Sequence, residues 1–338
     1  MNRNKLIGIV AACIIVVIVV LVISLSERRP VVTFPDPNLE AAVREALNKP
    51  SEPIHASELA ELASLAARGS GIEDLSGLQY CTSLTDLDLW LNQISDISTL
   101  ANLTNLTRIS LGDNGINDIS PLANLTNLKY LYLYSNQLSD ISPLANLTNL
   151  EYLSLESNQI SDISPLANLT NLTVLSLASN QISDVSPLAN FTNLIVLLLP
   201  SNHITDISPL ANLTNLRYLD LWLNQISDIS PLANLTSLTD LSLESNQISH
   251  ISTLANLTRL TYLYLRKNQI SDISALADLT NLTEILLYSN QIGDVSPLVD
   301  NPGLGEGDYV SLGNNPLSSD SINTYIHQLR VRGVTVGY

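Results

Sequence analysis

Leucine and isoleucine recur at fixed positions along most of the chain, with short polar stretches between them. In residues 128–144, three leucines alternate with tyrosines, an asparagine follows, and further aliphatic residues come at intervals of three. The same pattern returns every 22 residues. A fixed period of this length predicts a solenoid, in which each repeat forms one turn of a coil. The marker asparagines of the successive periods are Asn92, Asn114, Asn136, Asn158, Asn180, Asn202, Asn224, Asn246, Asn268 and Asn290.

Each period predicts a strand, a bend and a short helical turn. The alternation in residues 128–134 is that of a strand whose leucines point into the coil and whose tyrosines point outward. The amide of Asn136 can donate and accept hydrogen bonds, so a column of asparagines is suited to satisfy the bending backbone of adjacent turns. Further on, Ser142 followed by Pro143 is typical of the start of a helical turn, with the serine as its cap.

The ends of the solenoid depart from the repeat, because a coil with two open apolar ends needs caps. Residues 36–61 predict a helical N-terminal cap in which Asp36 caps the first helix. Residues 62–317 form the predicted solenoid, although the last period, after Asn290, is lengthened. Residues 318–338 predict a C-terminal cap with one helix and a final strand.

An uncharged apolar run occupies residues 6–25, which is the length that crosses a bilayer as a helix. We interpret it as a transmembrane signal anchor, with residues 1–5 in the cytoplasm and residues 26–35 as a tether. The repeat domain is then extracytoplasmic, membrane-anchored and displayed at the cell surface. The alternative is a cleaved secretory signal, which would release the protein.

Charge and cysteine usage restrict the partners and the chemistry. The net charge of −17 opposes binding to nucleic acid, since phosphates would be repelled. Of the two cysteines, Cys13 lies in the apolar run and Cys81 takes a leucine position, so we expect Cys81 to be a buried hydrophobe. No nucleophile motif or phosphate-binding loop occurs, and we predict a protein that is not an enzyme and needs no cofactor.

A column of aspartates and four dispersed histidines raise the question of a metal. The aspartates lack the glycine-rich, closely spaced ligands of calcium sites, so we interpret them as turn caps. The histidines have no paired spacing for zinc, and we predict no metal site. The aspartate column consists of Asp96, Asp118, Asp140, Asp162, Asp184, Asp206, Asp228, Asp272 and Asp294.

The string Asn-Gln-Ile-Ser-Asp-Ile-Ser-Pro-Leu-Ala-Asn-Leu-Thr-Asn-Leu at residues 158–172 resembles the 22-residue leucine-rich repeats of bacterial internalin-like surface proteins. The resemblance extends over about residues 62–317, and residues 38–47 are similar to the helical N-terminal cap of these proteins. It implies an α/β solenoid, a leucine-rich-repeat horseshoe whose parallel β-sheet lines the concave face, and a role in binding other macromolecules through that face. The chain shows no wall-sorting signal, immunoglobulin-like module or wall-binding repeats, so host-cell invasion is not carried over.

Aromatic residues gather at the variable positions between the strand leucines, while the rest of each repeat is nearly free of them. Aromatic side chains on one face are typical of interface anchors. The simpler interpretation is that aromatic residues suit strands and stack on cross-strand neighbours. The candidate ligand-binding residues of the concave face are Trp90, Tyr130, Tyr132, Tyr134, Tyr152, Tyr218, Trp222, Tyr262, Tyr264 and Tyr288.

These patterns predict a non-enzymatic, extracytoplasmic protein that binds a protein or peptide partner through its concave face. The alternative is a cell-surface glycan-binding protein in which the same aromatic rings stack on sugars. A third hypothesis is a hydrolase that uses two of the carboxylates on this face.

Overall fold

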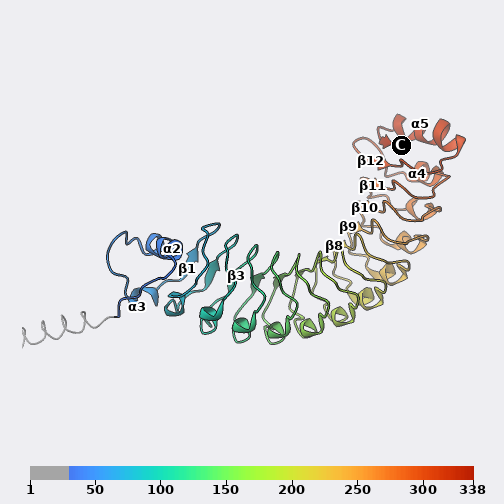
Figure 1. Cartoon of the computed structure of the whole chain (residues 1–338). Coiled ribbons are helices and arrows are strands. Elements are labelled where there is room, and N and C mark those ends of the chain that lie inside the picture. Colours follow the sequence, from blue (N-terminus) through green and yellow to red (C-terminus); the bar gives the residue numbers. More distant parts are fainter. Residues whose placement is uncertain (1–29) are drawn as a thin grey trace, which may run out of the picture.

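The computed structural model describes residues 30–338, and in this part of the chain thirteen short strands form one parallel sheet in sequence order. The coil bends into an open horseshoe, with the sheet on the concave side and the helical turns on the convex side (Figure 1). This arrangement confirms the predicted solenoid. The strands are β1 (Ser64–Ala66), β2 (Asp86–Asp88), β3 (Arg108–Ser110), β4 (Tyr130–Tyr132), β5 (Tyr152–Ser154), β6 (Val174–Ser176), β7 (Val196–Leu198), β8 (Tyr218–Asp220), β9 (Asp240–Ser242), β10 (Tyr262–Tyr264), β11 (Glu284–Leu286), β12 (Tyr309–Ser311) and β13 (Thr335–Gly337).

Helical segments occupy the convex side and both ends. The longer ones belong to the caps, whereas each regular turn has only a short 3₁₀ segment. The helices are α2 (Pro37–Leu47), α3 (Ala56–Leu59), α4 (Ser296–Asp300), the π-helical η11 (Ser321–Tyr325) and α5 (Ile326–Val331). The 3₁₀ segments are η1 (Leu78–Tyr80), η2 (Ser98–Leu100), η3 (Ser120–Leu122), η4 (Ser142–Leu144), η5 (Ser164–Leu166), η6 (Ser186–Leu188), η7 (Ser208–Asn212), η8 (Ser230–Asn234), η9 (Ser252–Asn256) and η10 (Ser274–Leu276).

The sheet register equals the sequence period. Tyr130 pairs directly with Tyr152, and every regular strand pairs with its neighbour at the same offset of 22 residues. The offset changes only at the end, where Glu284 pairs with Tyr309 and Tyr309 pairs with Thr335. Equivalent positions of successive repeats therefore form columns across the sheet.

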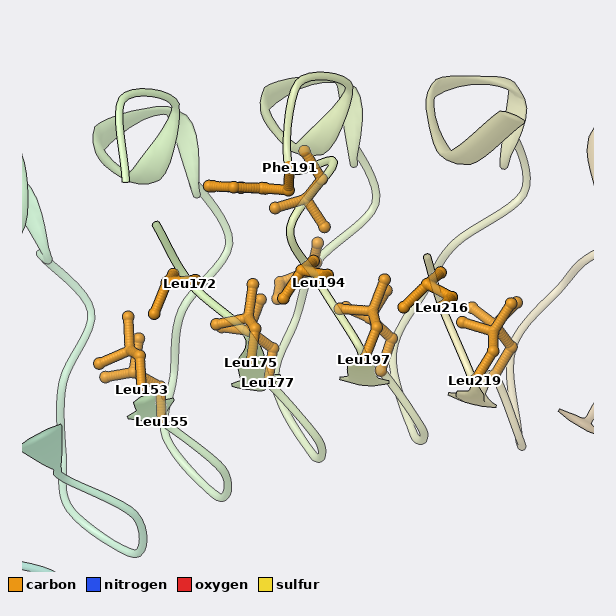
Figure 2. Close-up of a cluster of buried hydrophobic side chains, with 14 of the residues drawn as sticks. Leu153, Leu155, Leu172, Leu175, Leu177, Phe191, Leu194, Leu197, Leu216 and Leu219 are labelled. Atoms are coloured by element: carbon orange, nitrogen blue, oxygen red, sulfur yellow. The ribbon is translucent and has the colours of Figure 1, made fainter. Parts of the chain in front are cut away.

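The core is a stack of leucine layers between the strands and the helical turns. Figure 2 shows the leucines of neighbouring turns lying in rows, with Phe191 close to the helical turns. These side chains are fully buried, and so is Cys81, as predicted from its leucine position. Burial raises the pKa of the Cys81 thiol to about 12, so this group stays protonated at neutral pH.

The asparagine after each strand joins its own turn to the turn before it. Asn180 donates from Nδ2 to the carbonyls of Leu155 and Leu177, and its Oδ1 accepts from the Ile160 amide at 3.0 Å. Equivalent bonds occur from Asn92 to Asn290. The predicted role of the asparagine column in adjacent turns is confirmed.

A left-handed residue precedes each of these asparagines. Its φ lies between 50° and 58°, a region that residues with a side chain rarely adopt. Serine is the usual occupant, but Leu91 and Leu223 stand there in two turns. These two leucines are 53% and 47% exposed. Both follow a tryptophan in the identical sequence Leu-Asp-Leu-Trp-Leu-Asn, at residues 87–92 and 219–224.

Each aspartate of the column caps the helical turn that directly follows it in the sequence. Asp184 accepts a hydrogen bond at 2.8 Å from the backbone N–H of Ser186, the first residue of η6. The predicted turn-capping role of the aspartates is confirmed, whereas the prediction that the serine is the cap is wrong. At Asp162 and Asp228, the hydrogen bond from the serine amide lowers the pKa of the carboxyl.

One aspartate ties the N-terminal cap to the solenoid. Asp36 accepts from the amides of Asn38 and Leu39 with Oδ1, and so caps α2. Its Oδ2 accepts from the amides of Glu73 and Asp74 at 2.7 and 3.1 Å. Burial alone would raise the pKa of Asp36, but the four N–H donors together lower it.

The C-terminal end is closed by η11, α5 and β13, where the sequence predicts a helix and a final strand. At the other end, the predicted membrane helix at residues 6–25 and the segment 1–5 lie outside the described residues, as do residues 26–29 of the predicted tether. Residues 30–338 contain no helix that is both long and apolar enough to cross a bilayer.

Candidate binding face

All ten predicted aromatic residues lie on the solvent side of the sheet, in three columns. The first column contains the first residue of each strand, the second column its third residue, and the third column the residue two positions further on. Half of the ten side chains are partly buried. The exposed half, with 37–42% of each side chain accessible, consists of Tyr130, Tyr218, Trp222, Tyr262 and Tyr288.

The N-terminal group of aromatic residues is packed against itself. The rings of Tyr132 and Tyr152 lie 4.7 Å apart and are tilted by 35°, a favourable geometry for aromatic pairs. Arg108 belongs to β3, on the other side of β4 from Tyr152, and its guanidinium lies 5.4 Å from the Tyr132 ring. Stacking on cross-strand neighbours therefore accounts for these two tyrosines.

Tyr134 and Tyr288 each cover a glycine of the adjacent turn. A Cβ on Gly112 would lie 2.4 Å from the Tyr134 ring, and one on Gly313 would lie 2.9 Å from the Tyr288 ring. Aromatic rings that fill the space over a glycine stabilise the sheet. Burial raises the pKa of Tyr134 to about 12.

The two tryptophans differ in their surroundings. The indole Nε1 of Trp90 donates to Asp113 at 2.6 Å, and the Arg68 guanidinium lies 6.0 Å from its ring. Within the described residues no equivalent partner is recorded for the Trp222 ring, which is 42% exposed beside Leu223. The same six-residue sequence thus presents a tethered ring in one turn and an accessible ring in the other.

An apolar region separates the two aromatic groups. It contains Val174, Val196, Leu198 and Pro200, which are half-buried on the same side of the sheet. Beyond it, Tyr218, Tyr262 and Tyr264 form the C-terminal group. Burial raises the pKa of Tyr264 to about 12, and nearby carboxylates, Glu284 first, add to this effect.

Sequence reasoning missed three exposed apolar or aromatic residues on or beside this face. Tyr309 is 38% exposed and continues the first column in β12. The lengthened last period hid it, although its position six residues before Asn315 would have identified it. Leu91 and Leu223 were missed because the position before the asparagine is otherwise polar in the regular turns.

The charges of the face are distributed unevenly. In the N-terminal half, Arg68 pairs with Asp88 at 2.5 Å and Arg108 with Asp86 at 3.5 Å. In the C-terminal half, Arg266 pairs with Glu244. Residues 30–338 bring together no group of three histidine, cysteine or acidic side chains suited to hold a metal ion.

Comparison with known sequences defines the class of protein. A family model described as "Leucine Rich repeats (2 copies)" matches residues 104–146, 148–190, 192–234, 214–256 and 258–300, which is more than half of the chain. A single-copy "Leucine Rich repeat" model matches residues 80–97. The chain is therefore a leucine-rich-repeat protein, a class that acts in interactions between proteins. No curated protein matches it.

Solved structures narrow the class further. An internalin (InlF) from Listeria monocytogenes is 43% identical, with a TM-score of 0.85, and the match covers 90% of this chain and 88% of that one. Internalin C2 (InlC2) of the same organism is 42% identical over 66% of this chain and 98% of its own, with a TM-score of 0.61. The chain belongs to the internalin-like leucine-rich-repeat proteins of bacteria. A plant peptide hormone receptor, RGFR1 in complex with RGF2, shares the fold at 20% identity (TM-score 0.56, covering 71% of this chain and 49% of the receptor).

Proposed function

We propose that the protein binds a protein or peptide partner through the solvent side of its sheet, without catalysis. The observation that carries this proposal is the exposure of Tyr130, Tyr218 and Tyr262 in one column. Their neighbours within the same strands, such as Leu131 and Leu219, already fill the core. The outward tyrosines can therefore vary without disturbing the fold, and large exposed rings are effective anchors in interfaces.

The internalin-like relatives support a binding role at the level of the class. The packing described above also limits which residues can contribute. Tyr132 and Tyr152 contact each other, and Tyr134 covers Gly112, so removing any of them would alter the sheet itself. Tests of binding should therefore use the exposed tyrosines.

A random peptide library selected on the full chain tests this proposal. We expect enriched peptides to bind at least about tenfold more weakly when Tyr130, Tyr218 and Tyr262 are all changed to alanine, since exposed anchor residues each contribute about 1 kcal/mol or more. Tyr80→Ala is the matched control, because Tyr80 is 41% exposed but lies in η1, away from the strands. We expect it to bind like the parent protein.

Two results would contradict the proposal. Equal affinity of the triple variant for the enriched peptides would show that another surface binds. Enrichment of no peptide, together with glycan-array binding that the triple variant loses, would favour the glycan alternative instead.

We also propose that the repeat domain lies outside the cytoplasm, held by residues 6–25. The support is the length and apolar character of that segment in the sequence. Protease added to intact cells or wall-free protoplasts should digest the repeat domain. If the repeat domain resisted the protease while the cell membrane stayed intact, this topology would be contradicted.

A further inference from the structure

The first column of the C-terminal half alternates between aromatic and acidic side chains. Tyr218 pairs with Asp240, Asp240 with Tyr262, Tyr262 with Glu284, and Glu284 with Tyr309. We call these five residues the aromatic–acid ladder. No position in the first column of the N-terminal half repeats this alternation, since it runs Asp86, Arg108, Tyr130, Tyr152.

The tyrosines of the ladder are accessible. Tyr218, Tyr262 and Tyr309 are 37%, 39% and 38% exposed, so each ring presents surface to solvent beside a carboxylate. Neighbouring strands lie about 4.8 Å apart, so each carboxylate has a ring on either side at that spacing. A carboxylate between two aromatic rings suits a cation, which gains from both the charge and the ring faces.

The carboxylates of the ladder lack the ion pairs found elsewhere on the face. In residues 30–338, neither Asp240 nor Glu284 forms a salt bridge. Asp86, which takes the same column position in β2, is paired with Arg108. The basic residue of the third column in this half, Arg266, is held by Glu244. Asp240 accepts a hydrogen bond from the Thr239 hydroxyl, and Glu284 lies within electrostatic range of Arg266. Within residues 30–338 the ladder thus presents two carboxylates without a salt-bridge partner on this face.

We propose that this face docks an extended, arginine- or lysine-rich segment of a partner protein that runs across the strands. The inference rests on the proposed function and names the chemistry of the partner. The two ladder carboxylates are two strands apart, or about 9.6 Å. In an extended chain of the polyproline II type, every third side chain returns to the same face after about 9.3 Å, so basic residues at every third position match the carboxylates.

Binding of a fluorescent peptide with an arginine at every third position in a glycine–serine background tests the inference on the full chain. We expect the double variant Asp240→Asn, Glu284→Gln to bind about tenfold more weakly, since two exposed charge pairs are lost while side-chain shape is kept. Asp86→Asn is the matched control and should leave the affinity unchanged. Rising ionic strength should weaken binding to the parent protein, because exposed charges are screened.

Two further peptides and one further variant complete the test. A peptide with glutamate in place of arginine should not bind, and a peptide with its arginines in one contiguous block should bind more weakly. Tyr262→Leu should weaken binding of the spaced peptide, because the ring between the two carboxylates is lost.

Equal affinity of the double variant, or equal affinity for the acidic or the contiguous peptide, would overturn the inference. Such failure is distinguishable from failure of the proposed function. If library-selected peptides lose affinity for the triple tyrosine variant while the spaced basic peptide does not bind, the concave face remains the binding surface and only the basic partner is rejected.

Discussion

Each turn of the coil contains two polar bends. In both, a side chain hydrogen-bonds backbone groups, but the partners lie at different distances along the sequence. At the bend after the strand, Asn180 bonds backbone groups 20 and 25 residues earlier. At the bend before the helical turn, Asp184 bonds an amide only two residues away. The asparagine bend is buried and the aspartate bend is exposed. The first therefore holds turns to one another, and the second shapes a single turn.

The largest expected effect comes from breaking an asparagine bend in the middle of the coil. Asn180→Ala removes the hydrogen-bond partner of three buried backbone groups. They are the Ile160 amide and the carbonyls of Leu155 and Leu177. We expect a loss of about 3–5 kcal/mol in the free energy of unfolding, since each buried unsatisfied group costs about 1–3 kcal/mol. Urea titration followed by circular dichroism measures it.

Asn171→Ala is the control for this variant, because Asn171 is exposed and makes one side-chain bond, to the Thr148 carbonyl. Similar losses in the two variants would show that the neighbouring turns do not depend on the buried amide.

A smaller loss is expected for Asp36, which bonds backbone amides both in α2 and far along the chain. Asp36→Ala removes the acceptor for the amides of Leu39, Glu73 and Asp74. We expect a loss of about 2–4 kcal/mol, which combines a helix cap with two further part-buried amide bonds. Hydrogen exchange should show the loss concentrated in α2 and the first turns. Unchanged exchange in α2 would mean that the cap is held by its apolar contacts alone.

A gain in stability is expected at the left-handed residue of the asparagine bend. Leu223 has a φ of 54°, which a glycine adopts without strain. Leu223→Gly should therefore stabilise the protein by about 0.5–1 kcal/mol, although a glycine also loses entropy on folding. A thermal melt that shows destabilisation would mean that the exposed leucine packs usefully in its turn. A weaker interaction with a partner in the same variant would reveal a binding role for Leu223.

The smallest effect is expected at an ordinary aspartate bend. Asp162→Asn keeps an acceptor for the Ser164 amide but removes the charge. The pKa of Asp162 is lowered from its ordinary value of 3.8 by that amide, so the carboxylate stabilises the fold above this pH. Its contribution is lost as the pH falls from 3.8 through the lower folded pKa. The variant should match the parent in Tm at pH 7 and lose slightly less Tm on acidification; a large fall at pH 7 would contradict the local role.

The regular turns could be predicted from the period almost completely, because one asparagine and seven apolar positions repeat in every turn, with Phe191 in place of a leucine in one of them. The roles of individual aromatic residues were not predictable. Tyr130 and Tyr134 look equivalent in sequence, but the Tyr134 ring covers Gly112 of the preceding turn and is therefore less exposed. Only the cross-strand neighbour, 22 residues away, decides this. The sequence also could not show that the ladder carboxylates Asp240 and Glu284 form no salt bridge within residues 30–338.

The fixed register has a consequence for how such a chain can change. Because every regular junction is made by the same amide bonds, removing or duplicating a whole repeat would join surfaces that already fit. The accessible tryptophan loop and the tethered one, now six repeats apart, would then move along the axis in increments of about 4.8 Å. Reach between two contact points is thus adjustable in discrete steps, with no redesign of the interior.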